Sequence, residues 1–455
     1  MHEHAKPFSA RELTNQKKYS VFTQKNKAWE NFNDPLLEQL ISVALVDSPN
    51  MQIAKARIRR AAALSSGAAA TLWPTIDLNG YIQRQKFSKF GLVPPPFNGL
   101  TFNIADVGFN FNYDFDLWGK NRQILASRLD EACAEQADFA ESKLIIATAV
   151  ADTYFQLLNM MKQTRLAKDN LQISEKISNI VLTRSLHGID SDIPVKTSLA
   201  NVESARLSIQ EFKEKDKLLR NELAILLGKN PFTTLIIPQH SIFNSRHIDL
   251  PNPLSINLIA HRPDVASAAL RMSAAAHQIN AAKARFFPNI NLNALFSYQT
   301  IELNHLFDPA SQNNAITGAI DLPIFDAGAR RAALGIQYAE FDLAVIHYNP
   351  TILTALREIA DELARLKTVN AQLRAQQQAV KDIAHNYKLF NSRYNHGVVD
   401  YVQVLEIKHL LLEQQAKQAD LETKYQRTFI AMIKALGGNF MSSRDRNDKN
   451  IESNK

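Results

Sequence analysis

Long apolar runs, cysteine pairs and glycine are all scarce in this chain of 455 residues. No apolar run approaches the ~18–20 residues of a membrane-spanning helix, which argues against helices of that kind. The single cysteine, Cys133, cannot form an internal disulfide and is expected to be a small core residue. Only 14 residues are glycine, while alanine, leucine, lysine, glutamate and glutamine fill long stretches. Such a composition predicts a mainly α-helical protein.

Signatures of enzymes, metal sites and nucleic-acid binding are missing too. The sequence has no glycine-rich phosphate loop, no nucleophile elbow and no paired-cysteine metal site. Its 12 histidines are scattered, and its net charge of +7 comes from basic residues interspersed with acidic ones. A nucleic-acid binder usually gathers its basic residues on one face. We therefore expect no catalysis, no cofactor, no metal and no nucleic-acid partner.

An export signal is also absent, because residues 1–33 contain no hydrophobic stretch of the signal-peptide kind. These residues are expected to be an N-terminal extension. Residues 439–455, which are rich in serine, aspartate and asparagine, are expected to be a disordered tail.

The rest of the chain repeats one plan. Trp73-Pro74 returns as Phe287-Pro288, and His187-Gly188 returns as His396-Gly397, each roughly 210 residues later. The other anchors are Gly119 with Arg122, matched by Gly328 with Arg331, and Leu227-Gly228, matched by Leu436-Gly437. Several anchors in one order at nearly constant spacing indicate an internal duplication.

Each copy predicts a helix, two strands, a long helix, a tight turn and a return helix. Residues 121–186 contain no proline or glycine, and their apolar residues step by three and four, as in a coiled coil. At ~1.5 Å per residue this helix would be about 100 Å long, too long for a compact globule. Asp34 and Asp192 are the expected N-caps. Pro350 is expected to kink the second long helix or to leave backbone groups unpaired around it.

The predicted elements fall into two repeats. The first repeat is 34–228, with a helix at 34–72, a β-hairpin at 75–117, a long helix at 121–186 and a return helix at 192–227. A connector follows at 229–254. The second repeat is 255–438, with a helix at 255–286, a β-hairpin at 289–326, a long helix at 329–395 and a return helix at 398–436.

Residues 109–116, within the first predicted hairpin, alternate strictly between aromatic and polar residues. Phe109, Phe111 and Tyr113 share one face, whereas Asn110 and Asn112 share the other. A half-buried sheet of a soluble protein has this pattern. So does a transmembrane barrel strand, which is apolar toward lipid and polar toward a watery lumen. Four strands cannot close a barrel, and open edges are not tolerated in lipid, so a barrel would need several chains. A conduit favours three or more.

Several motifs together resemble the outer-membrane efflux (TolC-like) family, and within it the drug-efflux lipoproteins of resistance-nodulation-division systems. The matching stretches, in family order, are Trp29-x-x-Phe32-x-Asp34-Pro35-Leu36, Phe115-Asp116-Leu117-Trp118-Gly119-Lys120, His261-Arg262-Pro263-Asp264-Val265, Ala284-Arg285-Phe286-Phe287-Pro288, Leu322-Pro323-Ile324-Phe325-Asp326 and Tyr394-x-x-Gly397-Val398-x-x-Tyr401-x-x-Val404-Leu405. Members of this branch usually begin with an acylated cysteine, and none stands near this N-terminus.

The resemblance implies a mainly α protein with a membrane β-barrel. Three copies would form a homotrimer with a twelve-stranded barrel and a tunnel of long coiled-coil helices. It would lie in the outer membrane, in contact with its lipid, with the tunnel in the periplasm. The implied partners are a periplasmic adaptor protein and an inner-membrane resistance-nodulation-division pump, and the implied function is passive export of small toxic compounds or drugs.

The family's tunnel narrows at its periplasmic end, and the resemblance implies which residues form that aperture. Glu406 would line it, and Gln403 stands where some members carry a second acidic residue. Tyr401 and Asp192 stand where contacts that lock the helical hairpins are expected. The hairpin tips presented to the adaptor would contain Gly188, Ser191, Gly397 and Val399.

Two other functions agree with parts of this sequence. A duct for type I protein secretion would have nearly the same fold and residues. A soluble coiled-coil scaffold would explain the long helices and the missing signal peptide. That scaffold would not explain why alternating strands recur between the helices of both copies.

Overall fold

The computed structural model describes residues 29, 32, 34–233, 237 and 262–438. The predicted tail, nearly all of the predicted N-terminal extension and most of the predicted connector lie outside the described residues. The elements in chain order are α1 (Pro35–Asp47), α2 (Pro49–Ala70), β1 (Thr75–Lys86), β2 (Thr101–Phe115), α3 (Lys120–Leu186), α4 (Asp192–Leu226), α5 (Pro263–Ala284), β3 (Asn289–Thr300), the 3₁₀ turns η4 (Leu303–His305) and η5 (Pro309–Ser311), β4 (Gln312–Asp321), α6 (Ala329–Asn395) and α7 (Tyr401–Ala435).

The chain forms two compact units. The sheet unit contains residues 57–136 and 267–349, and the helix unit contains the described residues of 9–56, 137–266 and 350–455. Both repeats contribute to both units, so the compact units do not coincide with the two predicted repeats.

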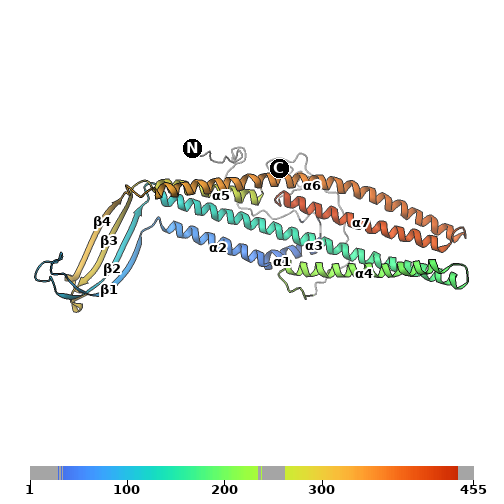
Figure 1. Cartoon of the computed structure of the whole chain (residues 1–455), viewed down its shortest axis with the longest axis horizontal. Helices are drawn as coiled ribbons and strands as arrows, with labels where there is room; N and C mark the ends of the chain where they lie inside the picture. The colour runs from blue at the N-terminus through green and yellow to red at the C-terminus, as the bar shows by residue number, and fades with distance from the viewer. Residues whose placement is uncertain (1–28, 30–31, 33, 234–236, 238–261, 439–455) are drawn as a thin grey trace, which may run out of the picture. The chain divides into compact units, whose positions relative to one another are not determined.

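The long helices α3 and α6 have 67 residues each, and Figure 1 draws each of them as one continuous ribbon. Both begin after a glycine with positive φ, Gly119 at 75° and Gly328 at 89°. An aspartate before each glycine binds backbone N–H groups of the first turn: Asp116 accepts from Asn121, and Asp326 accepts from Arg330. The carboxylates thereby satisfy donors that a helix start leaves free.

The prediction paired Arg122 at the start of α3 with Arg331 at the start of α6, but the structure pairs it with Arg330. Arg122 lies 3.3 Å from the Asp116 carboxylate, and Arg330, not Arg331, lies 2.6 Å from the Asp326 carboxylate. This ion pair lowers the pKa of Asp326. Pro350 lies inside α6, which continues as one helix to Asn395 even though proline donates no backbone hydrogen bond.

The first predicted helix, 34–72, is two helices. Asp34 caps α1 as expected, because its side chain accepts from the backbone N–H groups of Leu36 and Leu37. Ser48 then leaves the helical region, with φ −58° and ψ 132°. The reason is the residue that follows, since Pro49 disfavours helical geometry at the position before it.

The sheet unit is built on one antiparallel sheet with strand order β1-β2-β3-β4. The register aligns the apolar positions of neighbouring strands: Phe109 lies opposite both Leu78 and Phe296. Gly108 is required where β2 meets β3, because a Cβ there would lie 2.2 Å from Cβ of Ser297. Among the residues that the structure describes, strands β1 and β4 each have one partner, so each leaves one edge unpaired.

The largest core lies in the helix unit, where α3 packs against α1, α4 and α7. Its fully buried side chains include Leu37, Tyr154, Leu223 and Phe429. The hydroxyl of Tyr154 donates to the Asp34 carboxylate over 2.7 Å, so the cap of α1 is held by the helix it packs against.

Two features of α3 differ from expectation. Cys133 is exposed rather than part of the core. The helix also contains an 18-residue window that is long and apolar enough to cross a membrane, and 61% of that window is buried within the protein. Its few charged residues interrupt the apolar ones, so the window contains no uninterrupted apolar run of membrane-spanning length. Its burial marks a core helix.

Candidate functional site

The two helical hairpins of the helix unit end in nearly identical turns. In the first turn, the N–H of Gly188 donates to Ser185 and that of Ile189 donates to Arg184, each over 2.9 Å. The second turn repeats these bonds, from Gly397 to Tyr394 and from Val398 to Arg393, also over 2.9 Å. The two glycines have φ of 70° and 71°. This geometry closes the exposed carbonyl end of a helix and needs a left-handed residue, which explains the repeated glycine.

The predicted tip residues lie on or beside these turns. Gly188, Ser191 and Gly397 are exposed, and Val399 is half-buried. A Cβ on either glycine would meet nothing within 4 Å, so the positive φ rather than crowding requires glycine. Both turns lie at the same end of the helix unit in Figure 1.

Asp192 was predicted to be the N-cap of α4, but it is the first residue of that helix. Ser191 is the N-cap, and its side chain makes no capping hydrogen bond. Asp192 is exposed, and no hydrogen bond or ion pair of its side chain is found within the described part of the chain. The carboxylate is one position too late for a cap, but it stays in the first turn, where negative charge is favoured.

The remaining aperture candidates occupy the first two turns of α7. Gln403 and Glu406 are exposed and three residues apart, so they lie on one face of the helix. Between them, Leu405 is buried in a cluster with Leu166 and Ile173 of α3. Burial of this face fixes the rotation of α7 and points Glu406 away from α3.

Tyr401 is the first residue of α7, which begins three residues later than predicted. Its ring lies 5.0 Å from the ring of Tyr394, the residue before the turn of the same hairpin. Asp400, not a residue of the predicted site, is the N-cap and accepts from the N–H of Gln403 over 2.9 Å. The predicted locking residue Tyr401 therefore braces its own hairpin.

A contact between the two hairpins comes from Arg184, a residue that the sequence did not single out. Its guanidinium lies 2.9 Å from the carboxylate of Asp190 in its own turn. It also lies 3.8 Å from the carboxylate of Asp400 in the other hairpin. No local pattern distinguishes Arg184 from other helix arginines, because its partners come from two different turns.

Further from the tips, a polar seam joins α3 to α7. Arg427 pairs with Asp152 over 2.6 Å, and Lys162 pairs with Glu422 over 2.8 Å. Side-chain amides of α3 extend this seam: Asn159 and Gln163 both donate to Asp420, over 2.8 and 2.9 Å. These bonds set the register of one hairpin against the other.

In the sheet unit, the register places all the carboxylates of the strands on the polar face. Asp77 lies opposite Asn110, Asp114 opposite Asn291, and Asp321 opposite Asn289. Asp106 shares this face and accepts from the hydroxyl of Ser297 over 3.2 Å. The polar face of the sheet is therefore acidic.

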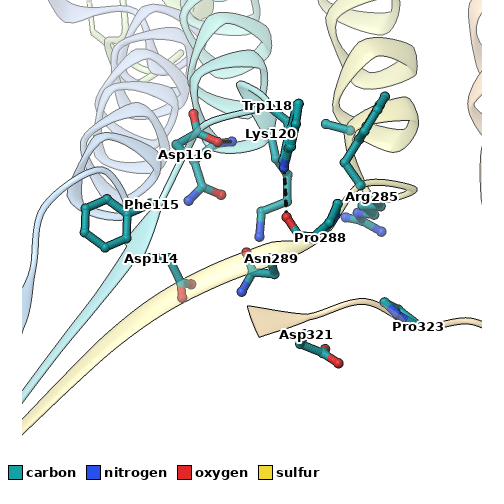
Figure 2. Close-up of a pocket in the computed structure, with 13 residues that line it drawn as sticks. Asp114, Phe115, Asp116, Trp118, Lys120, Arg285, Pro288, Asn289, Asp321 and Pro323 are labelled. Carbon is teal, nitrogen blue, oxygen red and sulfur yellow. Dashed lines mark hydrogen bonds between the residues drawn. The ribbon is translucent and has the colours of Figure 1, made fainter. Parts of the chain in front are cut away.

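A cavity of about 140 Å³ lies where the strands of the sheet unit join its helices. Figure 2 shows the Trp118 indole N–H donating to the carbonyl of Pro288, over 2.8 Å. The indole also stacks on Phe287, with ring centroids 4.7 Å apart. Asp114 and Asp321 approach from the strand ends, with Lys120 and Arg285 from the helix side. The tryptophan thus ties the start of α3 to the loop that enters β3.

Comparison with known proteins agrees with this architecture. The family model for outer membrane efflux proteins matches residues 40–229 and 254–438. The multidrug resistance outer membrane protein MdtQ of Escherichia coli O157:H7 is 28% identical over 432 residues, covering 90% of this chain and 87% of MdtQ.

Two solved structures share the fold. The outer membrane protein VceC of Vibrio cholerae is 30% identical, with a TM-score of 0.79 over 92% of this chain and 100% of VceC. The transmembrane channel protein CusC is 26% identical, with a TM-score of 0.80 over 92% of this chain and 96% of CusC.

The chain belongs to the outer membrane efflux protein family. It is an outer-membrane channel protein, and the channels of this family are trimers that work with other components of efflux pumps. The family match removes the soluble coiled-coil scaffold as an alternative.

Proposed function

We propose that three copies of this chain form a passive duct that exports small toxic compounds or drugs from the periplasm to the exterior. Their sheets would close a twelve-stranded barrel, and their long helices would line a tunnel. The observation that carries this proposal is the sheet itself, which has an apolar face, an acidic polar face and one unpaired edge on each outer strand. In lipid, such edges must pair, and pairing with further copies closes the barrel.

The same proposal assigns no catalytic role to any residue. Transport through the duct would be driven by an inner-membrane pump of the resistance-nodulation-division type, joined through a periplasmic adaptor. Relatives named for multidrug resistance and for solvent efflux support this class of exported compound.

The duct is tested in two steps. The protein would be extracted from outer membranes in detergent, and its mass and single-channel conductance in planar bilayers would be measured. We expect trimers that conduct steadily, and restored drug tolerance when the gene is returned to a host without its own outer-membrane channel. Monomers that insert without conductance would contradict the proposal.

Within the duct, we assign the periplasmic aperture to the start of α7, with Glu406 as its charged residue and Gln403 beside it. Both side chains are exposed, and together they lie on the side of α7 away from the buried Val404 and Leu405. Tyr401 supports the proposed aperture by packing on Tyr394. Asp192 contributes an exposed carboxylate from the other hairpin, without an ion-pair partner among the described residues.

Reversing one charge tests this assignment. Glu406→Lys should lower the preference for cations over anions, measured as the reversal potential in a salt gradient. Glu214→Lys, on an exposed position of α4 far from the turns, is the matched control. Equal reversal potentials for Glu406→Lys and the unsubstituted protein would remove Glu406 from the aperture.

The hairpin tips, with Gly188, Ser191, Gly397 and Val399, are assigned to adaptor docking. The exposure of Gly188, Ser191 and Gly397 and the repeated turn geometry support this role. Cysteines placed at Ser191 and Val399 should cross-link to a coexpressed adaptor, whereas a cysteine at exposed Lys217 in α4 should not. Absence of cross-links from both tip positions would contradict the docking site.

A further inference from the structure

The charges of the sheet are sorted between its two faces. The four strands carry four carboxylates and two basic side chains. All four carboxylates lie on the polar face. Arg84 and Lys86 occupy alternate positions of β1 with Ile76, Leu78 and Ile82, so both basic side chains lie on the apolar face.

The height of the apolar face can be measured along β2. Its side chains on this face run from Phe115, beside the helices, to Ala105. These positions span about 33 Å of strand, or about 25 Å of height at a strand tilt of about 40°. That height equals the apolar band of an outer-membrane barrel, so Ala105 marks its far border.

Arg84 and Lys86 lie immediately beyond this border. In the register, Ile82 is opposite Ala105, Arg84 is opposite Asn103, and Lys86 is opposite Thr101. The helices join the strands at the other end, so this border faces the exterior. A basic side chain costs little free energy at such an interface, but about 2–4 kcal/mol at the bilayer midplane.

Both side chains are available to a ligand. Arg84 and Lys86 are exposed, and neither is in an ion pair within the residues that the structure describes. Their cross-strand neighbours Asn103 and Thr101 are exposed as well and supply further hydrogen-bond donors. Two cations separated by two residues on one face of a strand are about 7 Å apart, which allows them to bind neighbouring phosphates.

We propose that Arg84 and Lys86 bind the phosphate groups of a phosphorylated glycolipid of the lipid A class in the outer leaflet. The site lies on the lipid face at headgroup level, where such phosphates are concentrated, and its guanidinium can bind a phosphate through two hydrogen bonds. This inference rests on the proposed duct, because it takes the apolar face as the lipid face.

The test measures lipid binding to purified trimers by native mass spectrometry. Lipid A with both phosphates would be compared with dephosphorylated lipid A. The affinity of the double variant Arg84→Gln/Lys86→Gln for bisphosphorylated lipid A should fall by roughly tenfold or more. The charge-preserving double variant Arg84→Lys/Lys86→Arg should retain binding. Lys213→Gln/Lys217→Gln, which removes two exposed charges from α4, is the control.

Equal binding by the Gln variant and the unsubstituted protein would overturn the site, as would equal binding of dephosphorylated lipid A. The conductance of every variant is measured in parallel. A conducting Gln variant that has lost lipid A supports the site and shows an intact barrel. An unsubstituted protein that neither conducts nor forms trimers would refute the duct, whereas conduction with unchanged lipid binding refutes this site alone.

Discussion

At the scale of single residues, the same amino acid is required for different reasons in different places. Gly188 and Gly228 both follow a helix and have φ of 70° and 68°. Around Gly188 a Cβ would meet nothing within 4 Å, whereas at Gly228 it would lie 2.5 Å from the carbonyl oxygen of Asp47. The two positions therefore separate the cost of the backbone conformation from the cost of crowding.

This difference predicts unequal effects of alanine. Gly188→Ala should lower the free energy of unfolding by about 1 kcal/mol, through the left-handed conformation alone. Gly228→Ala should lower it by about 2–4 kcal/mol, because α1 must also move. Urea unfolding followed by helical circular dichroism measures both. Equal decreases in the free energy of unfolding would mean that the end of α1 at Asp47 can move aside without loss of stability.

A second prediction concerns Glu141 in α3. Burial raises its pKa, and the nearby carboxylate of Asp264 raises it further, with partial compensation from Arg262 and Lys434. The folded protein thus favours the protonated form, so this stabilising contribution is present below the unfolded pKa and is lost as pH rises through the folded pKa. Glu141→Gln should therefore be more stable than the unsubstituted protein at neutral pH, and the difference should vanish in acid.

The measurement is the thermal midpoint across a pH series. Glu214→Gln, at an exposed position, should show no such trend. A pH-independent effect of Glu141→Gln would indicate that the carboxylate stays charged in the fold.

At the scale of elements, a single arginine joins three helices of the helix unit. Arg262, 6% exposed, precedes α5 and binds Asp264 in its first turn over 2.8 Å. It also binds Glu358 of α6 and the carbonyl of Ala435 at the end of α7, each over 2.8 Å. Burial alone would lower its pKa, but the bonds to Asp264 and Glu358 outweigh burial and raise the pKa. The guanidinium is therefore charged, and each of its three nitrogens donates at least one hydrogen bond.

Removing this arginine should be costly. Arg262→Ala leaves two carboxylates and a helix-end carbonyl without their partner, and should lower the free energy of unfolding by about 3–5 kcal/mol. Arg206→Ala is the control, since Arg206 is 53% exposed and pairs only at the surface of α3 and α4, and should cost less than about 1 kcal/mol. Chemical unfolding of both variants measures the two free energies. Similar decreases would mean that the Arg262 ion pairs contribute no more to stability than a surface pair does.

At the scale of the whole molecule, the sorted charges of the sheet acquire a function only when the barrel is closed. In a trimer each carboxylate of the polar face would occur three times around the lumen. A lumen lined with carboxylates attracts cations and repels anions. The acidic wall would then act in series with the proposed aperture at Glu406.

The wall is tested by neutralising two exposed carboxylates. Asp77→Asn/Asp321→Asn should reduce the permeability of cations relative to anions, read from the reversal potential in a salt gradient. Arg84→Gln/Lys86→Gln changes two charges of the same sheet on the opposite face, and should leave the reversal potential unchanged. Equal shifts in both double variants would mean that the faces have been assigned to the wrong sides.

The sequence determined those features that depend on neighbours along the chain. The duplication, the long helices at 121–186 and 329–395, the alternation of β2 and the glycine turns are all visible as periods or local signals. The break at Ser48 was also local, since Pro49 causes it, and it was missed because the helical pattern resumes directly afterwards.

Tertiary structure alone decided which distant residues meet. Arg184 contacts Asp400 in the other hairpin, and Arg262 contacts Glu358 and the end of α7. Cys133 is exposed although its neighbour Ala134 is buried. The register that sorts Arg84 from the carboxylates also required the paired strands. A periodic pattern specifies which face of an element is apolar, but the partner of a polar group depends on the packing of elements far apart in sequence.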